Sequence, residues 1–511
     1  MNHQSQKTKL HSILLTLSFL TLSCMSIAHA QPWDQTHKLL PSDGASGDQF
    51  GSSVAVSVDT AVIGAPFDDG EYFTDTGSAY VLDLVTGQQL FKILASNGEG
   101  GDNFGNSVAI DNSVLIGAEF GFAPNGCIGG TAYTFETFNG QLISQVCDSY
   151  ADANSEFGHS VAINTGNEVI GAPANNLNGI DSGSATVFDV SGNRLSRLLR
   201  SDPAEGDHFG ISVAIYAVSA VIGANGDDDN GIDSGSAYVF DAYTGQQLVK
   251  ILPSDGASGD QFGSSVALSF GSYAVIGAPG DDDNGNDSGS AYVFDIETGQ
   301  QLVKLLPSDG APGDQFGSSI SISDGGRAVI GAPGDDDNGT DSGSAYVFDI
   351  YTGQQLVKLL PSDGASGDQF GSSVSISGDF AVIGALYDDD NGPDSGSAYV
   401  FQQRTTNYLT IEPFPLQSGQ DGTFSIVESL PNETSWLLFS INGLSPTFIP
   451  QLNVTVDINN PRIAVGPVLT DGNGDWQVIH QIPAVTAPRT VWFQAVQHNN
   501  VTNFFRAKII P

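Results

Sequence analysis

The sequence has few basic residues, few cysteines and few tryptophans. Of its 511 residues only 16 are Lys or Arg, against 58 Asp or Glu, so the net charge is −42 at neutral pH. Nucleic acids and anionic membrane surfaces are bound through basic patches, and this composition makes both poor partners. Glycine is abundant, at 62 residues, and 40% of the residues are hydrophobic, which together favour a turn-rich all-β protein over a disordered one.

Long hydrophobic runs are missing after the first thirty residues, so we expect no membrane span. Within those thirty, Lys7 and Lys9 precede an apolar stretch over residues 13–22, and residues 28–30 are Ala-His-Ala. A basic start, an apolar stretch and a small-x-small tripeptide are typical of a signal peptide. We therefore predict a signal peptide over residues 1–30, cleaved after Ala30, and a protein that is secreted, periplasmic or at the cell surface.

Only three cysteines are present. Cys24 lies inside the predicted signal peptide and could be a lipidation cysteine, but Thr21 stands where such signals usually have an aliphatic residue. Cys127 and Cys147 remain after export, and an oxidising compartment permits one disulfide bond between them. The alternative is two free buried thiols.

A Phe-Gly pair recurs along the chain at intervals of 52 to 54 residues. Such a period indicates a repeat architecture. The chain therefore contains seven copies of one unit. Their phenylalanines are Phe50, Phe104, Phe157, Phe209, Phe262, Phe316 and Phe370.

Each copy contains four strand-like segments separated by turn residues. In the fifth copy these segments are residues 262–269, 273–279, 290–296 and 300–307. The second is apolar on both faces, which predicts a strand in the middle of a sheet. The fourth is interrupted by Lys304, which suits an outer strand. The pattern predicts one antiparallel four-stranded sheet per copy.

The two ends of the repeat array complement each other. The seventh copy stops after its third strand, near Arg404, and residues 38–43 read KLLPSD, the sequence that ends the other copies. An N-terminal strand that pairs into the last sheet would close a ring and remove the open edges of a linear array. We therefore predict an all-β fold in which residues 31–404 form a seven-bladed β-propeller.

The repeat resembles the FG-GAP repeat of integrin alpha-chain propellers and their bacterial relatives. Besides Phe-Gly, it has Gly-Ala-Pro at residues 64–66, 171–173, 277–279 and 331–333. Copies two, four and seven depart from the third letter, with Glu119, Asn225 and Leu386. The resemblance implies a propeller used for extracellular binding.

Most of the acidic residues lie in two kinds of loop, which in a propeller open on the same face. One loop joins the second strand to the third, and the other joins each copy to the next. The first kind reads DDDNGxDSG in four copies. Calcium takes six to eight oxygen ligands and accepts carboxylates, so these loops are candidate calcium sites. The candidate ligands are Asp227, Asp229, Asp233, Asp281, Asp283, Asp287, Asp335, Asp337, Asp341, Asp388, Asp390 and Asp394.

The prediction of calcium sites in these loops stays open. Integrin-type repeats carry their calcium loop between the first and second strands, where this sequence has only short turns such as residues 269–272 and 323–326. The family's ligands are therefore not carried over. The alternative is a solvated acidic rim that keeps the protein soluble in salt.

The composition changes after the repeats. Residues 405–511 contain alternating runs separated by Pro and Gly turns, which predicts an accessory β-sandwich of six or seven strands.

Enzyme chemistry finds little support in the sequence. The histidines are scattered, His159 and His208 beside Phe-Gly pairs are interpreted as tolerated substitutions, and no nucleophile or zinc set is placed by a motif. None of the four tryptophans lies within the repeated units, unlike in propellers that dock a quinone.

We therefore expect a non-catalytic, monomeric binding or adhesion protein whose acidic face presents a surface to an extracellular protein or glycan, with calcium as the possible cofactor. One alternative is an exported enzyme that acts on polysaccharide or uses a quinone. Another is a structural surface protein whose acidity is an adaptation to salt.

Overall fold

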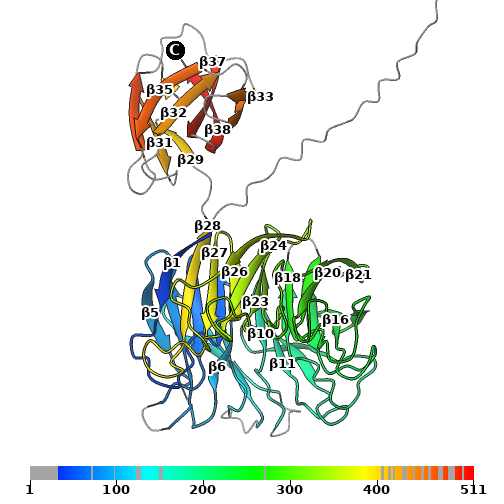
Figure 1. Ribbon diagram of the computed structural model, residues 1–511. Coiled ribbons are helices and arrows are strands. Elements are labelled where there is room, and N and C mark those ends of the chain that lie inside the picture. Colours follow the sequence, from blue (N-terminus) through cyan, green and yellow to red (C-terminus); the bar gives the residue numbers. More distant parts are fainter. Residues whose placement is uncertain are drawn as a thin grey trace, which may run out of the picture. The chain divides into compact units, whose positions relative to one another are not determined.

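The computed structural model describes residues 33–403, except 71–72, 97, 122–127, 149–153 and 270–271, and beyond them only the strands between residues 408 and 510 (Figure 1). The predicted signal peptide lies outside the described residues. Among the described residues no helix is long and apolar enough to cross a bilayer.

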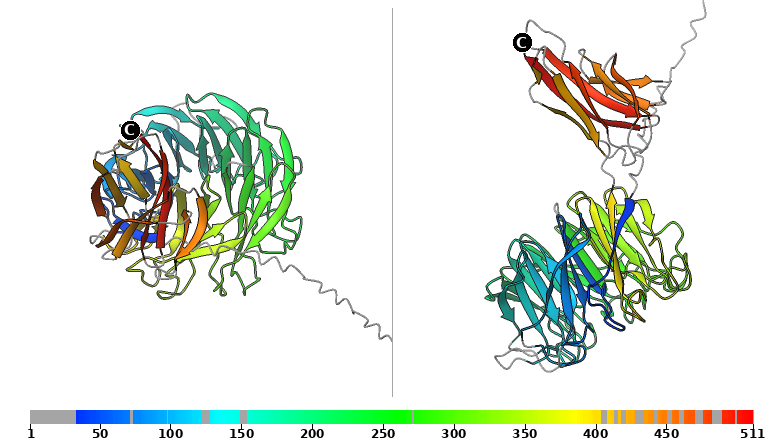
Figure 2. Two further views of the ribbon diagram at one scale, coloured as in Figure 1. Left: turned by 90° about the horizontal axis from the view of Figure 1, so that it is seen from above. Right: turned by 90° about the vertical axis from the view of Figure 1, so that its left-hand side faces the viewer.

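Residues 33–403 form seven four-stranded antiparallel sheets, arranged as the blades of a ring that is seen end-on in the left view of Figure 2. Blades are numbered here in the order of their sequence copies. Blade 1 consists of β2 (Ser53–Ser57), β3 (Thr60–Ala65), β4 (Ser78–Asp83) and β5 (Gln88–Ile93); blade 2 of β6 (Phe104–Ile110), β7 (Ser113–Ala118), β8 (Thr131–Glu136) and β9 (Leu142–Val146); blade 3 of β10 (Val161–Asn164), β11 (Asn167–Ala172), β12 (Ser184–Asp189) and β13 (Arg194–Leu198); and blade 4 of β14 (Val213–Tyr216), β15 (Ser219–Ala224), β16 (Ser236–Asp241) and β17 (Gln247–Ile251). Blade 5 consists of β18 (Ser265–Ser269), β19 (Tyr273–Ala278), β20 (Ser290–Asp295) and β21 (Gln300–Leu305); blade 6 of β22 (Ile320–Ile322), β23 (Arg327–Ala332), β24 (Ser344–Asp349) and β25 (Gln354–Leu359); and blade 7 of β26 (Phe370–Ser377), β27 (Phe380–Ala385), β28 (Ser397–Gln403) and β1 (Trp33–Leu39).

The ring is closed by the N-terminal strand. β1 pairs antiparallel with β28, from Trp33 opposite Gln403 to Leu39 opposite Ala398. The innermost strands contact one another in a closed circle, β2 to β6, β10, β14, β18, β22, β26 and back to β2. The prediction of a seven-bladed all-β propeller closed by an N-terminal strand is confirmed.

The core lies between the blades. The second strands are buried on both faces, as their apolar sequences predict, and each hydrophobic cluster joins two neighbouring blades. Val275 and Val293 of blade 5 pack with Ile330 and Phe348 of blade 6, for example. Each blade thus depends on its neighbours for burial.

The Phe-Gly and Gly-Ala elements of the repeat are the places where blades meet. Phe316 is fully buried and forms a short parallel bridge with Gly289 of the preceding blade. A Cβ atom on Gly331 would lie 1.9 Å from the carbonyl oxygen of Gly371 in the next blade. Only glycine permits backbones to approach so closely. The repeat signature therefore describes the joint between blades.

This joint also corrects one predicted boundary. The first strand of blade 5 begins at Ser265 and not at Phe262. Phe262 bridges to Gly235 of blade 4, and Gly263 has a φ of +94°, so the chain turns before it enters its own sheet.

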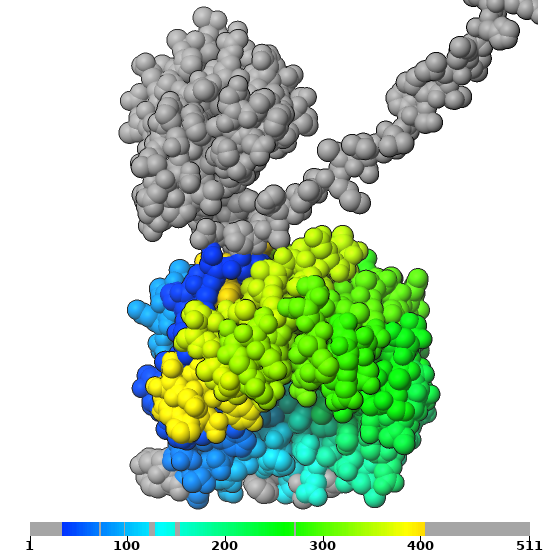
Figure 3. Space-filling view, in the orientation of Figure 1, coloured from blue at the N-terminus to red at the C-terminus, as the bar shows by residue number. Residues whose placement is uncertain are grey.

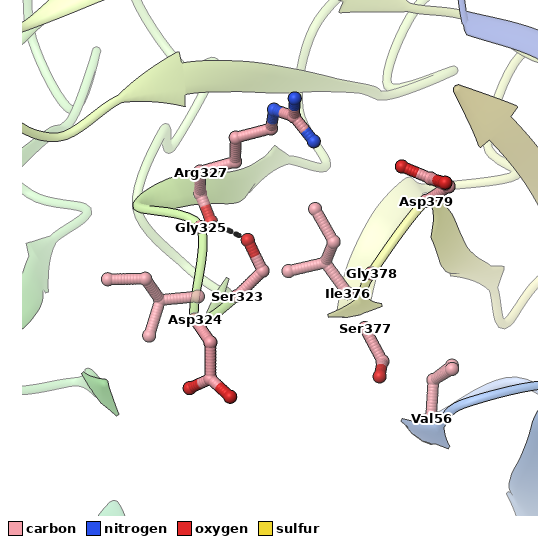
Figure 4. A pocket seen from close by; sticks show the side chains of 10 residues that line it. Val56, Ser323, Asp324, Gly325, Arg327, Ile376, Ser377, Gly378 and Asp379 are labelled. Carbon is pink, nitrogen blue, oxygen red and sulfur yellow. Dashed lines mark hydrogen bonds between the residues drawn. The ribbon is translucent and has the colours of Figure 1, made fainter. Parts of the chain in front are cut away.

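The ring has two unlike faces. The loops between second and third strands and the connections between blades lie on one, here named the loop face, which is the lower side of the ring in Figure 1. In Figure 3 the loop between β27 and β28, in yellow, protrudes there. Short turns form the opposite turn face. Close to the innermost strands on the turn face lies a pocket of about 370 Å³, whose lining includes Ile322, Ile376, Asp324, Arg327 and Asp379 (Figure 4).

Beyond the propeller, ten strands are described. They form a three-stranded sheet, a five-stranded sheet and a two-stranded sheet, with the orders β29-β31-β36, β30-β38-β37-β32-β35 and β33-β34. Their bounds are β29 (Tyr408–Glu412), β30 (Leu416–Gln417), β31 (Asp421–Val427), β32 (Thr434–Ser440), β33 (Leu444–Ile449), β34 (Val454–Ile458), β35 (Arg462–Leu469), β36 (Trp476–Gln481), β37 (Arg489–Gln497) and β38 (Asn500–Ile510). The alternating runs of the sequence lie on these strands, but the described strands number ten and not the six or seven predicted. The packing of these sheets as a sandwich stays a prediction.

Candidate functional site

Each DDDNGxDSG loop surrounds the side chain of a lysine on the loop face. In blade 5, Lys304 extends from the outermost strand, β21, and its Nζ lies 2.8 Å from Asp281 Oδ2 and 2.7 Å from Asp283 Oδ2. A third carboxylate, Asp255 of the connection from blade 4, lies 2.9 Å away. One ammonium group therefore neutralises part of a three-carboxylate set.

This arrangement, here named the lysine cluster, recurs around the ring. The other clusters are Lys38 with Asp363, Asp388 and Asp390; Lys92 with Asp43 and Asp68; Lys250 with Asp202, Asp227 and Asp229; and Lys358 with Asp309, Asp335 and Asp337. Blade 3 has an ion pair between Arg197 and Asp148 instead, and blade 2 has the neutral Gln145 at the lysine position. The lysines were missed as site residues by the sequence analysis, which interpreted Lys304 only as a mark of an outer strand.

A tyrosine holds the inner acid of the cluster. Tyr292 donates its hydroxyl hydrogen bond to Asp281 Oδ2 at 2.9 Å, and Lys304 Nζ lies 5.0 Å from the centre of the Tyr292 ring, within reach of a cation–π contact. The side chain of Asp281 is 5% exposed, whereas those of Asp255 and Asp283 are 45% and 51% exposed. Each cluster with three carboxylates therefore buries one and leaves two at the surface, and the Lys92 cluster buries Asp68 and leaves Asp43.

Electrostatics keep the cluster charged. Burial alone would lower the pKa of Lys304, but its hydrogen bonds to Asp281, Asp283 and Asp255 raise that pKa above its ordinary value. Burial likewise acts to raise the pKa of Asp255, and the hydrogen bond from Lys304 outweighs it, so the pKa of Asp255 is lowered. The ion pair between Lys304 and Asp255 thus persists from weakly acid to strongly alkaline pH.

The structure brings only some of the predicted calcium ligands together. Asp281 and Asp283 converge on the ammonium group of Lys304, as their counterparts do on the other lysines. Asp287 and its counterparts Asp233, Asp341 and Asp394 take no part in the ion pairs of the clusters. The carboxylate of Asp287 is exposed, and its N–H binds Asp282 Oδ1. Among the described residues no group of three or more His, Cys, Asp or Glu side chains has an arrangement that could hold a metal ion.

The donors therefore do not fit calcium while the ammonium group holds them, and calcium binding at these loops stays a prediction. We expect calcium, magnesium and sodium salts at matched ionic strength to raise the thermal midpoint of residues 31–511 equally over an EDTA control. The reason is that the inner acids are already paired and the exposed ones respond to screening. A rise specific to calcium would instead assign an ion to the loops, because a ligand that binds only the folded state stabilises it.

A second kind of buried acid precedes the Phe-Gly pair by two residues. Asp314 is 4% exposed and accepts a hydrogen bond of 2.7 Å from the backbone N–H of Ala311. Burial raises its pKa to about 6, and that of Asp48 likewise to about 6, because desolvation outweighs this hydrogen bond. The counterparts Asp102, Asp207, Asp260 and Asp368 also have raised pKa values, with burial as the largest cause.

Because the pKa values of these buried acids are raised, we expect the protein to gain stability under mildly acid conditions. The folded state takes up a proton at Asp314 near pH 6, whereas the ordinary carboxyl does so at 3.8, so stability rises as the pH falls through 6 toward 4. We expect Asp314→Asn to raise the free energy of unfolding by about 1 kcal/mol at pH near 7.5, after allowance for solvent screening, and to lose about half of this advantage by pH 5. Urea unfolding at the two pH values checks it.

The exposed Asp324 on the turn face supplies the control. Asp324→Asn removes the same charge from an exposed position, so its unfolding curve should match that of the parent protein at both pH values. An Asp314→Asn variant that behaves like Asp324→Asn would show that Asp314 titrates as an ordinary carboxyl.

Cys147 is disulfide-bonded. The predicted partner, Cys127, lies outside the described residues, so the pairing itself stays a prediction.

Comparison with known proteins supports the repeat and little else. The model of the FG-GAP repeat matches residues 33–82, 88–135, 144–188, 193–240, 246–294, 300–348 and 354–401. No curated protein matches the chain.

Solved structures give only distant likenesses. A europium-containing methanol dehydrogenase is 10% identical, with a TM-score of 0.38 over 72% of this chain and 93% of its own. The acylaminoacyl peptidase of Pyrococcus horikoshii is 11% identical, with a TM-score of 0.41 over 74% of this chain and 58% of its own. Likenesses at this level carry no argument about what the chain does. The seven matched segments, in contrast, cover more than half of the sequence, and each spans the outermost strand of one blade and the three inner strands of the next. The chain belongs to the FG-GAP repeat family.

Proposed function

We propose that this protein is an exported, non-catalytic binding protein whose loop face presents an acidic surface to a protein or glycan partner. One observation carries the proposal. Each lysine cluster buries one carboxylate and leaves others exposed at fixed positions, so blades 4 to 7 repeat the same acidic pattern. The acidic array, as we name it, comprises Asp229, Asp233, Asp283, Asp287, Asp337, Asp341, Asp390 and Asp394.

The array suits recognition better than catalysis. A lysine carries one positive charge against three carboxylates, so each full cluster keeps a negative charge after internal pairing. Repeated exposed charges steer a complementary partner toward the face and make its association sensitive to salt. A single catalytic centre would need different residues on different blades, whereas these copies are nearly identical.

The chain offers a variant that removes charge from the array with little structural change. Asp233, Asp287, Asp341 and Asp394 have φ values of +52° to +56°, a conformation that Asn also tolerates. Changing all four to Asn removes four negative charges. Asp83, Asp241, Asp295 and Asp349 begin the turns between third and fourth strands on the opposite face, so changing these four to Asn is the matched control.

The test is saturable binding of labelled residues 31–511 to cell envelopes and extracellular material of the source organism, at low and at physiological ionic strength. We expect the array variant to bind roughly tenfold more weakly at low salt and the control variant to bind like the parent protein. Absence of saturable binding, or equal loss in both variants, would overturn the proposal and favour a structural, salt-adapted protein. Turnover of a polysaccharide by the purified chain would favour the alternative of an exported enzyme.

A further inference from the structure

The seven copies allow each position of one blade to be compared with the same position in the others. On the loop face, a groove of about 410 Å³ lies between blades 5 and 6. Its lining is Gln261, Ser264, Pro279, Gly280, Asp287, Gln315 and Ser318. Its volume falls within the range of small-molecule sites. The lining residues are those that flank Phe-Gly and those that end Gly-Ala-Pro.

The repeat breaks at these positions in blades 2 and 3. Blades 1, 5, 6 and 7 have Gln before Phe-Gly and Ser after it. Blade 2 has Asn103 and Asn106 at these places, and blade 3 has Glu156 and His159. Glu119 and Phe120 stand where blade 5 has Pro279 and Gly280. The same repeat positions between blades 2 and 3 therefore carry different polar side chains.

These side chains bind one another. Glu119 Oε2 lies 2.9 Å from His159 Nδ1 and accepts a hydrogen bond of 3.2 Å from Asn106 Nδ2. Glu119 Oε1 accepts one of 3.4 Å from Asn103 Nδ2, and Glu156 Oε2 lies 4.0 Å from His159 Nδ1. We name these five residues the polar cluster. Glu119 fixes the orientation of three planar side chains from two blades.

The polar cluster keeps unused hydrogen-bonding capacity. Among the described residues Asn106 Oδ1 is buried with no donor. The side chains of His159 and Glu156 are 32% and 33% exposed. Phe120, directly after Glu119, is a 42% exposed aromatic residue. Blades 1 and 7 have the aromatic residues Phe67 and Tyr387 at this position, whereas blades 5 and 6 have glycine, so only blade 2 combines an aromatic residue here with the polar cluster. The site thus combines donors, acceptors and an apolar ring.

Sugars match this combination. Their hydroxyl groups both donate and accept, so planar side chains in a fixed array can bind them in pairs, and the C–H face of a sugar ring packs on an aromatic ring. The carboxylates of the cluster itself, Glu119 and Glu156, disfavour anionic ligands.

We propose that the polar cluster and Phe120 form a binding site for a neutral glycan. The inference rests on the proposed binding function and deepens it by assigning one partner class to one place on the loop face.

Reversion to the consensus of the repeat gives a sharp test. Asn106→Ser, Glu119→Pro and His159→Ser together install residues that blades 5 and 6 already accept at the same positions, so the reverted chain should fold. Phe120→Gly tests the aromatic contact in the same way. Ser264→Asn with Ser318→His is the matched control, because it changes the groove between blades 5 and 6 and leaves the polar cluster intact.

The probes are soluble starch, mixed-linkage β-glucan, xylan and mannan as neutral polysaccharides, with alginate and polygalacturonate as anionic ones, in affinity electrophoresis of residues 31–511. We expect at least one neutral polysaccharide to retard the protein, the reverted variant and Phe120→Gly to bind roughly tenfold more weakly, and the control to bind like the parent. Near-ultraviolet circular dichroism confirms that each variant is folded.

Retardation by no neutral polysaccharide, by anionic ones alone, or equally in parent and reverted chains would overturn the inference. Such a result would leave the proposed function standing if the acidic array still binds cell envelopes, because the array variant and the reverted variant change different residues. If the array variant no longer binds envelopes but is still retarded by glycans like the parent protein, the acidic array and the polar cluster act as two separate sites.

Discussion

Gly331→Ala will leave the propeller unfolded or lower its free energy of unfolding by more than about 4 kcal/mol. The new methyl group would lie 1.9 Å from the carbonyl oxygen and 2.9 Å from the carbonyl carbon of Gly371. Both atoms belong to the backbone of the next blade, which cannot rotate away as a side chain does. Gly371 is itself confined, since a Cβ there would lie 2.3 Å from the oxygen of Ser344. Urea unfolding followed by far-ultraviolet circular dichroism measures the loss.

Gly325→Ala is the matched control. Gly325 lies on the turn face of the same blade, its nearest neighbour would be Ser323 Oγ at 3.8 Å, and its φ is not positive. We expect a change within about 0.5 kcal/mol. Equal stability of the two variants would mean that the blades are not held together at the Gly-Ala element.

Lys304→Met will destabilise the propeller by about 3 to 5 kcal/mol, because it leaves Asp281 buried without its counter-charge. Methionine retains an unbranched apolar side chain beside Tyr292, so the change chiefly removes the ammonium group. Asp255 and Asp283 lose the same partner and then repel one another. Equilibrium unfolding in urea at neutral pH measures the effect.

A second substitution separates lost charge from lost packing. In the Lys304→Met background, Asp281→Asn removes the unpaired buried charge and keeps an acceptor for Tyr292, so most of the lost stability should return. If the double variant is no more stable than Lys304→Met, the lysine stabilises the blade by packing and not by its charge.

The fold could be predicted from the sequence because the propeller is a repeat. Turn residues and apolar runs at a fixed spacing mark the strands, and the displaced copy of KLLPSD at residues 38–43 marks the closing strand. The start of the first strand could not be predicted, because equivalent phenylalanines differ among the blades. Phe262 bridges to Gly235 and lies before β18, whereas Phe370 bridges to the preceding blade and also pairs with Ala385 of its own sheet.

The lysine clusters could have been found, since a signal was present. A lysine occupies the fourth strand of blades 4, 5, 6 and 7, the four with a DDDNGxDSG loop, and Gln145 replaces it in blade 2, where the loop has lost its aspartates. Charge and counter-charge vary together among the copies. The acidic residues alone suggested a bound calcium ion, and the lysine ammonium groups that pair with them were overlooked.

The polar cluster was harder to recognise. His159 was interpreted as a tolerated substitution, because its partner Glu119 precedes it by 40 residues and lies in another blade. Each residue by itself is a single departure from a repeat, and only the three-dimensional arrangement shows that the departures meet. The histidine is therefore a partner of Glu119 and not an isolated change.

Closure by β1 imposes an order on biosynthesis. The hydroxyl group of Thr36 donates a hydrogen bond to the carbonyl oxygen of Val400, 364 residues further along the chain. β1 therefore cannot pair until β28, the last propeller strand in the sequence, has been synthesised. Until residues 397–403 emerge, blade 7 lacks its third strand and β1 has no edge to join. A nascent chain of this protein is therefore an open arc with two unpaired ends until residues 397–403 have emerged.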